Sequence, residues 1–205
     1  MDYYALVPVK SLSVAKSRLD GHLSEDERTQ LVTQMLEHVL MTLQSCKKIT
    51  QIFVVTPDEQ IKKFTSKYKA TFLPEEQSGY NQSVTMAAKR IIQNNTTLLT
   101  IAADLPLLTI DDLQQMIQRT KNHAVVLAPA KDGGTNAIAM KSLQMLPYLF
   151  GKESFTKYQQ EATKRKISVG VYQSETIAFD IDTIEDLKKL HSLLLPIPYK
   201  LSPIH

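Results

Sequence analysis

The chain has 205 residues, of which 43% are hydrophobic and 22% are charged, and its formal net charge is +3. These values are ordinary for one globular domain, and they exclude a disordered or fibrous chain. A nucleic-acid-binding protein is disfavoured, because the lysines and arginines are spread among acidic residues rather than clustered with aromatic ones. We therefore expect any site for a negatively charged ligand to be local.

Cys46 is the single cysteine, which excludes an intrachain disulfide and the usual zinc-binding spacings. The apolar run at the N-terminus is short and no basic residue precedes it, so neither a leader nor a membrane span is predicted. These features predict a cytoplasmic protein.

Short apolar runs alternate with helical patterns along the whole chain. Strands are expected at residues 4–9, 49–56, 70–73, 98–103, 124–129, 137–140, 167–171 and 177–181. Helices are expected at residues 24–43, 58–67, 80–93, 154–165 and 184–195. A further helix is expected to begin at Thr109, as its N-cap, with Asp111 and Asp112 in the first turn. Since no internal repeat or linker interrupts the series, we predict a single α/β domain over residues 1–205.

The first predicted strand is continuously apolar, which is typical of a central parallel strand. The loop after it carries Lys10, Lys16 and Arg18 without acidic partners. Three cationic donors at a strand end could neutralise a polyphosphate, and a solvated surface loop would have the same composition. The glycines of a P-loop or a dinucleotide fingerprint are absent from this loop.

Two of the predicted helices begin with informative residues. Ser24 and Glu27 form a capping box at the start of the first helix. At the start of the helix 80–93, Asn81 offers a donor and acceptors that could contact a purine edge, or it caps the helix. Both interpretations of Asn81 stay open at this point.

The stretch around Asp104 is the most informative in the chain. The apolar strand 98–103 runs into this aspartate, and Pro106 lacks the N–H that a central strand would need to continue. Because ligands of open α/β sheets bind outside the carboxyl ends of the strands, Asp104 could hold a cation such as Mg²⁺ there. Alternatively, Asp104 shapes a turn or caps the following helix.

Two later segments could contact an anionic ligand. Gly133 and Gly134 would let the backbone pass close to a ligand, with the polar Thr135 and Asn136 beside them, or they form a tight turn before the next strand. Ser154 lies at the start of a predicted helix. This serine and its neighbouring amides could therefore bind an anion at the helix N-terminus, or Ser154 is an ordinary cap.

Asp180 and Asp182 alternate at the end of the predicted strand 177–181, which puts both side chains on one face. They could be a pair of metal ligands, or Asp182 could cap the helix 184–195. The tail 195–199 combines apolar residues with prolines that exclude a helix. We expect this tail to lie across the domain or against a second subunit, which would make the protein a homodimer.

Five motifs follow one another along the chain. They are Pro8-Val9-Lys10 with Ala15-Lys16-Ser17-Arg18-Leu19, Ala103-Asp104-Leu105-Pro106-Leu107-Leu108, Gly133-Gly134-Thr135-Asn136-Ala137, Gly151 with Ser154-Phe155, and Asp180-Ile181-Asp182-Thr183 with Glu185-Asp186-Leu187. Together they resemble the 2-phospho-L-lactate guanylyltransferase family of coenzyme F(420) biosynthesis. The resemblance covers nearly the whole chain. It implies a Rossmann-like, mostly parallel mixed sheet with one reversed strand, flanked by helices as in nucleotide-diphospho-sugar transferases.

The resemblance also implies a reaction. GTP and 2-phospho-L-lactate would give lactyl-2-diphospho-5′-guanosine and pyrophosphate, and related family members take phosphoenolpyruvate or 3-phosphoglycerate instead. Tyr158 departs from the family pattern, in which a histidine is common near this position. This departure leaves the acceptor open, although not the nucleotidyl chemistry.

Roles for the candidate residues follow from this reaction. Mg²⁺ would bridge phosphate oxygens of GTP and would be held by Asp104 with Asp180 or Asp182. The triphosphate would be held by Lys10, Lys16 and Arg18. By resemblance, the acceptor's phosphate or carboxylate would contact Thr135, Gly151 and Ser154. The base or ribose would contact Asn81.

Two alternatives to this reaction are kept. The enzyme could transfer a guanylyl or cytidylyl group to another phosphorylated acceptor. A nucleotide-binding module without turnover, acting in assembly or regulation, is the other. The combination of Asp104, the loop cations and the late aspartates speaks against the module, since a pure binder has less need of a metal aimed at the α-phosphate.

Overall fold

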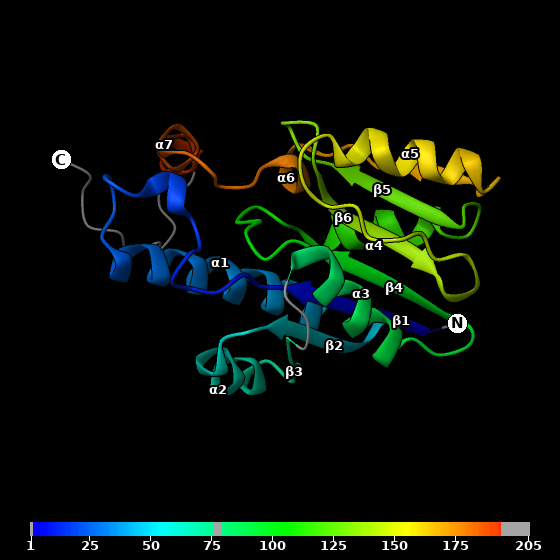
Figure 1. The fold of residues 1–205 in the computed structure, drawn as a ribbon, viewed down its shortest axis with the longest axis horizontal. Coiled ribbons are helices and arrows are strands. Elements are labelled where there is room, and N and C mark those ends of the chain that lie inside the picture. The colour runs from blue at the N-terminus through cyan, green and yellow to red at the C-terminus, as the bar shows by residue number, and fades with distance from the viewer. Residues whose placement is uncertain (1, 76–78, 194–205) are drawn as a thin grey trace.

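A seven-stranded sheet forms the middle layer of the protein in the computed structural model, which describes residues 2–75 and 79–193 (Figure 1). Its strands are β1 (Asp2–Pro8), β2 (Ile49–Thr56), β3 (Thr71–Pro74), β4 (Thr96–Ile101), β5 (Val125–Pro129), β6 (Thr135–Lys141) and β7 (Val169–Val171). They lie in the order β3-β2-β1-β4-β6-β5-β7. Only β6 runs antiparallel to its neighbours among these strands, so the predicted mostly parallel sheet with one reversed strand is confirmed.

Helices cover both faces of this sheet. They are α1 (Glu25–Ser45), α2 (Glu59–Lys67), α3 (Tyr80–Ile91), α4 (Ile110–Arg119), α5 (Ser154–Lys164), α6 (Glu175–Ala178) and α7 (Ile184–Leu193), with short 3₁₀ turns η1 (Ser17–Leu19) and η2 (Ser142–Gln144). The predicted capping box at α1 is confirmed, because the Glu27 amide donates to the Ser24 hydroxyl and the Glu27 carboxylate accepts from the Ser24 amide. Thr109 caps α4 in the same way, with Asp112 as its partner.

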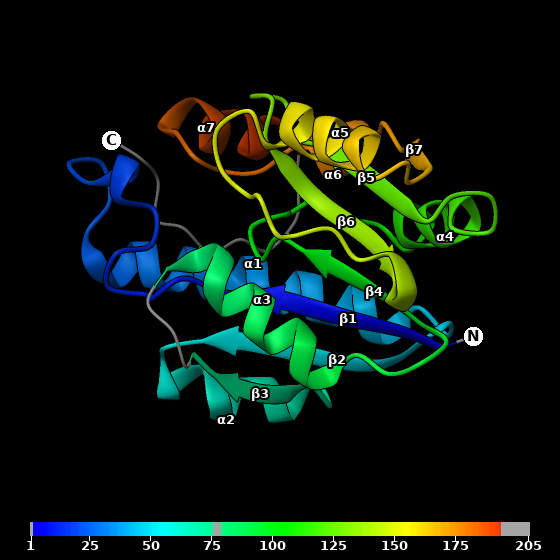
Figure 2. The ribbon, with the colours of Figure 1, turned by 45° about the vertical axis from the view of Figure 1, so that its right-hand side comes forward.

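Alternating side chains along the strands divide the apolar core into two parts. In β1, Ala5 and Val7 pack in a cluster with residues of α1, α4 and α7, whereas Tyr4 and Leu6 pack in a second cluster with residues of α3 and α5. Figure 2 shows α3 and α5 together on one face of the sheet. Both faces of the strand are therefore buried, as expected for a central parallel strand.

The carboxyl ends of β1 and β4 lie at the same edge of the sheet, which we call the functional edge. Because β6 is reversed, it is the beginning of β6 that lies beside the end of β4, where the Ala102 amide donates to the Asn136 carbonyl at 2.8 Å. The loops that follow β1 and β4 and the loop that precedes β6 consequently gather at one edge. These are the loops that carry most of the candidate residues.

The predicted strand 177–181 is wrong. Residues 175–178 form the short helix α6, in which the Ala178 amide donates to the Ser174 carbonyl at 3.0 Å, and the next residues have no ladder partner within the described chain. Ile177, Phe179 and Ile181 are all buried against the larger core cluster. This alternation of buried side chains has the period of a strand although the backbone winds over the core without pairing.

Several expectations fall outside what the structure describes. The tail 195–199 lies beyond the described residues, so its position and the expected homodimer stay predictions. Within residues 2–75 and 79–193, no helix has the length and apolar character needed to cross a membrane.

Candidate functional site

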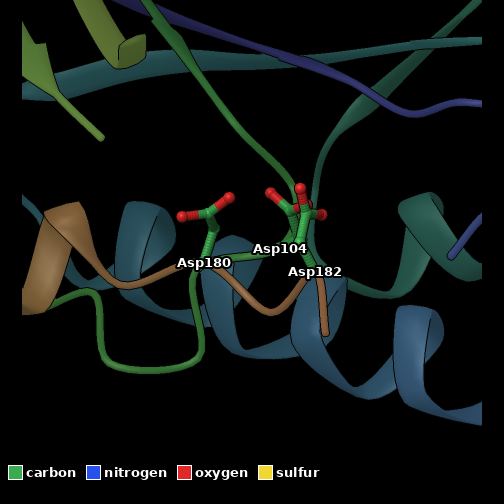
Figure 3. A group of neighbouring side chains, drawn as sticks. All are labelled: Asp104, Asp180 and Asp182. Carbon is green, nitrogen blue, oxygen red and sulfur yellow. The ribbon is translucent and has the colours of Figure 1, made fainter. Parts of the chain in front are cut away.

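Three aspartates meet at the functional edge (Figure 3). Asp104 comes from the loop after β4, and Asp180 and Asp182 come from the segment between α6 and α7. One carboxylate oxygen of each lies within 4.8 Å of those of the others, and Figure 3 shows the side chains rising from neighbouring segments toward a common space. The structure thus brings together the three residues that were predicted as metal ligands.

Lys16 and Arg18 of the first loop face these carboxylates. The Lys16 ammonium contacts the Asp104 carboxylate and donates to Asp182 Oδ1 at 3.1 Å, while Arg18 donates to Asp182 Oδ2 at 3.1 Å. Lys16 has a left-handed backbone (φ 55°), and only 8% of its side chain is exposed. Burial alone would lower the pKa of Lys16, but the charges and hydrogen bonds of Asp104 and Asp182 outweigh it and raise that pKa.

The pKa of Asp180 is affected by the negative charges that surround it. Burial first, and then the charges of Asp104 and Asp182, raise the pKa of Asp180 to about 6. The Asn136 amide donates to its carboxylate at 3.4 Å, which offsets this shift only in part. Closely placed carboxylates with a raised pKa and oxygen ligands on separate segments are a favourable setting for a hard divalent cation.

Lys10, the third cation of the first loop, lies over an aromatic ring. Its ammonium lies 5.6 Å from the centroid of the Tyr80 ring, at the start of α3. Burial first, and then the charge of Asp104, raise the pKa of the Tyr80 hydroxyl. Of the predicted triphosphate-binding trio, Lys16 and Arg18 contact the aspartates directly, and Lys10 contacts the tyrosine ring at the start of α3.

The candidates for acceptor binding also come together. The Ser154 hydroxyl donates to Thr135 Oγ1 at 3.0 Å, and the Phe155 amide donates to the Gly133 carbonyl at 3.3 Å. Gly151 lies three residues before Ser154, with φ at 120°, which is a conformation that favours glycine. The glycine-containing loop before β6 is consequently joined to the start of α5.

The start of α5 differs from the prediction in two respects. Its N-cap is Glu153 rather than Ser154, and Ser154 is the first helical residue and is fully buried. The Ser154 and Phe155 amides, which were expected to face an anion, donate to the carbonyls of Gly151 and Gly133. An anion here would have to be recognised by groups other than these two backbone amides.

Asn81 has partners that the sequence did not predict. It is not the N-cap of α3, which is Gly79. Its amide nitrogen donates to the Phe150 carbonyl at 3.0 Å, and its amide oxygen accepts from the Phe150 amide at 2.9 Å. Contact of Asn81 with a base or ribose stays a prediction.

Comparison with known proteins gives these residues a family. The sequence matches the family described as "Guanylyl transferase CofC like" over residues 3–193. The chain belongs to this guanylyltransferase family. A phosphoenolpyruvate guanylyltransferase of Sphaerobacter thermophilus is 33% identical over 192 residues, which are 93% of this chain and 93% of the relative. A 2-phospho-L-lactate guanylyltransferase of Methanocaldococcus jannaschii is 31% identical over 186 residues, covering 90% of this chain and 80% of the relative.

The fold also has counterparts among solved structures. A protein classed as a nucleotide-diphospho-sugar transferase, from Desulfovibrio desulfuricans G20, superposes with a TM-score of 0.81 at 15% sequence identity, over 100% of this chain and 93% of the other. The fold class predicted from the motifs is therefore confirmed. At this level of identity the likeness concerns the fold alone.

Some residues that shape this guanylyltransferase site were given no role in it from the sequence. Asn136, which was expected only as a polar side chain beside the glycines, donates to Asp180, and the Gly-Gly-Thr-Asn motif was a signal that could have identified this role. Lys131 contacts the Asp186 carboxylate, which also accepts from the Asp182 and Thr183 amides at 3.0 and 2.8 Å. These bonds hold the segment that carries the aspartates, and the Asp182 side chain faces Lys16 rather than capping α7.

Proposed function

We propose that this protein joins GTP to 2-phospho-L-lactate, or to a related three-carbon acid such as phosphoenolpyruvate or 3-phosphoglycerate, in coenzyme F(420) biosynthesis. The product with 2-phospho-L-lactate is lactyl-2-diphospho-5′-guanosine, and pyrophosphate is released. The family and the names of the relatives support this proposal. The observation that carries it in the structure is the meeting of Asp104, Asp180 and Asp182 with Lys16 at the functional edge.

The chemistry is a displacement at phosphorus. An oxygen of the acceptor's phosphate forms a bond to the α-phosphorus of GTP, and the bond from that phosphorus to the oxygen bridging the β-phosphorus breaks, so that pyrophosphate leaves. The second pKa of a phosphate monoester is near ~6, so the attacking oxygen is already ionised at neutral pH. The protein therefore needs no general base, and its task is to bring two anions together in line.

The carboxylates fit a magnesium ion. Oxygen ligands from separate segments and the excess of negative charge are what Mg²⁺ prefers, and we assign it to Asp104, Asp180 and Asp182. When bound, Mg²⁺ would neutralise phosphate charge and polarise the α-phosphoryl group. Lys16 and Arg18 would then be able to exchange carboxylate partners for phosphate oxygens.

The remaining assigned groups bind and orient the two substrates. Lys10, which lies beside Tyr80, adds a positive charge for the triphosphate. The acceptor's phosphate or carboxylate is assigned to Thr135, Gly151 and Ser154. Their convergence across two loops supports this assignment, since a small anionic acid would be contacted from two sides.

Pyrophosphate release with GTP, Mg²⁺ and a panel of phosphorylated acids tests the proposal. We expect release that depends on a three-carbon phosphorylated acid, and we expect Asp104→Asn to reduce it by at least about a hundredfold with an unchanged far-UV spectrum. Asp26→Asn, which alters an exposed carboxylate in the first turn of α1, is the matched control. Wild-type turnover in Asp104→Asn would refute the metal assignment. GTP binding without release with any acceptor would favour the non-catalytic module.

A further inference from the structure

We propose that Asn81 is a positioning residue that fixes the acceptor-binding loop, defined here as residues 145–153. This inference rests on the proposed function, because only the proposed function makes residues 145–153 a loop that binds the acceptor. The loop contains Gly151 and leads directly into Ser154, the first residue of α5. Phe150, the partner of Asn81, immediately precedes Gly151.

The contact between Asn81 and Phe150 is a two-point clamp. The side-chain amide donates to the Phe150 carbonyl at 3.0 Å and accepts from the Phe150 amide at 2.9 Å, so it pairs with one residue's backbone as a neighbouring strand would. A single hydrogen bond would let the loop pivot about it. Two bonds from one planar group fix both the position and the orientation of Phe150.

The loop has little other backbone support. Residues 145–150 belong to neither a helix nor a strand. The Leu149 amide donates to the hydroxyl of Tyr158 at 2.9 Å, and the Leu146 amide lies 3.3 Å from the sulfur of Met140. Side chains from α3, α5 and β6 thus replace the ladder that would hold a strand in place.

An aromatic cluster connects Phe150 to the strand that leads to Asp104. The Phe150 ring packs edge-on against Tyr80 and Tyr158, with centroids 5.8 and 5.9 Å away, and stacks on Tyr148 at 5.6 Å. The Tyr148 hydroxyl bonds to Thr100 Oγ1 at 2.7 Å, within the strand that leads to Asp104. These contacts therefore fix the position of the loop relative to both β4 and α3.

This geometry also gives Tyr158 a role. It is fully buried, and its hydroxyl points at the loop backbone rather than at a substrate. Asn81 and Tyr158 are anchors of adjacent residues, Phe150 and Leu149, from two different helices. Loss of either anchor should displace Gly151 and Ser154 relative to Asp104, and a displacement of about 1 Å can cost about a hundredfold in rate.

The test separates positioning from base recognition. In Asn81→Ala we expect the KM for the acceptor to rise about tenfold or more and kcat to fall, with the KM for GTP within about threefold of wild type and the preference for GTP over ATP unchanged. Tyr158→Phe should likewise raise the KM for the acceptor and lower kcat, although it leaves α3 intact. Gln82→Ala, an exposed neighbour on α3, is the matched control.

Amide hydrogen exchange provides a readout that needs no turnover. The Phe150 amide should exchange at least about tenfold faster in Asn81→Ala than in wild type or Gln82→Ala. Unchanged exchange, or a raised KM for GTP with lost preference over ATP and an unaltered acceptor KM, would overturn the inference. Wild-type protein that releases no pyrophosphate with any acceptor would instead refute the proposed function, while exchange would still decide whether the clamp holds the loop.

Discussion

Asp112 is the buried residue whose replacement we expect to be most damaging. Its carboxylate is 1% exposed and ties two distant segments together. It accepts from the Thr109 amide and hydroxyl at 2.8 and 2.7 Å, and from the hydroxyls of Tyr172, Ser174 and Thr176 at 2.9, 2.6 and 2.7 Å. The second segment leads through α6 to Asp180.

The expected size of the effect follows from these donors. Hydrogen bonds to a charged group contribute about 1.5–3 kcal/mol each, but they are not additive. In Asp112→Asn, the hydroxyls can rotate to accept from the new amide, whereas the Thr109 amide can only donate. We therefore expect a loss of about 3 kcal/mol in the free energy of unfolding, or about 9 °C in Tm for a chain of this size.

The loss should depend on pH in a defined direction. Burial acts to raise the pKa of Asp112, but the hydrogen bonds from Ser174, Thr109 and Thr176 outweigh it, and the pKa is lowered from its ordinary value of 3.8. The folded state thus binds this proton more weakly than the unfolded state. The stabilisation is complete above the unfolded pKa of about 3.9 and is lost as the pH falls through the lower folded pKa.

Urea denaturation at several pH values measures both expectations. The difference between wild type and Asp112→Asn should be largest above about pH 4 and should shrink in more acidic buffer. Asp111→Asn, an exposed neighbour in the first turn of α4, should change stability by less than about 0.5 kcal/mol. A loss below about 1 kcal/mol in Asp112→Asn, or one that does not vary with pH, would refute this account.

Three further results are expected. Lys16→Met leaves the Asp104 and Asp182 carboxylates without their buried counter-ion. Because these side chains are 28% and 37% exposed, we expect a loss of only about 2 kcal/mol in the free energy of unfolding, measured by urea denaturation with EDTA. A variant as stable as the wild type would contradict this. Mg²⁺ at a hundred times its Kd should stabilise the wild type by about 2.7 kcal/mol in thermal unfolding, and an equal gain in Asp180→Asn would exclude that residue as a ligand. Gly170→Ala places a Cβ 2.5 Å from the His123 ring and should cost about 2 kcal/mol, with stability recovered in the double variant that also carries His123→Ala; a neutral single variant would show that the ring moves freely.

Features that depend on neighbouring residues were predicted well. The capping box of Ser24 and Glu27 and the cap at Thr109 use partners three residues away, so the sequence contains the whole interaction. The gathering of Asp104 with Asp180 and Asp182 was predicted through the family resemblance, and it is found although Asp180 and Asp182 follow a short helix rather than a strand.

Features that depend on distant partners were not predicted. Asn81 and Phe150 are 69 residues apart, and no local pattern distinguishes a clamp of this kind from a cap or a base contact. The contact of Lys10 with the Tyr80 ring was not predicted either, since it joins the first loop to the start of α3, far along the chain. In both cases the residue type indicated polar recognition, while its partner was set by tertiary packing.

The reversal of β6 has a consequence for how much chain the protein can spare. The 7 residues of β6 carry the backbone roughly 20 Å away from the functional edge, and the chain must cover that distance again to reach Gly151. The chain from Lys141 to Gly151 provides the return, and with one turn of 3₁₀ helix it could span about 30 Å. The return is therefore about 10 Å longer than it needs to be, so chain length alone does not fix where Gly151 lies. A residue could be removed or added there, provided that the contacts of Asn81 and Tyr158 with the loop are kept.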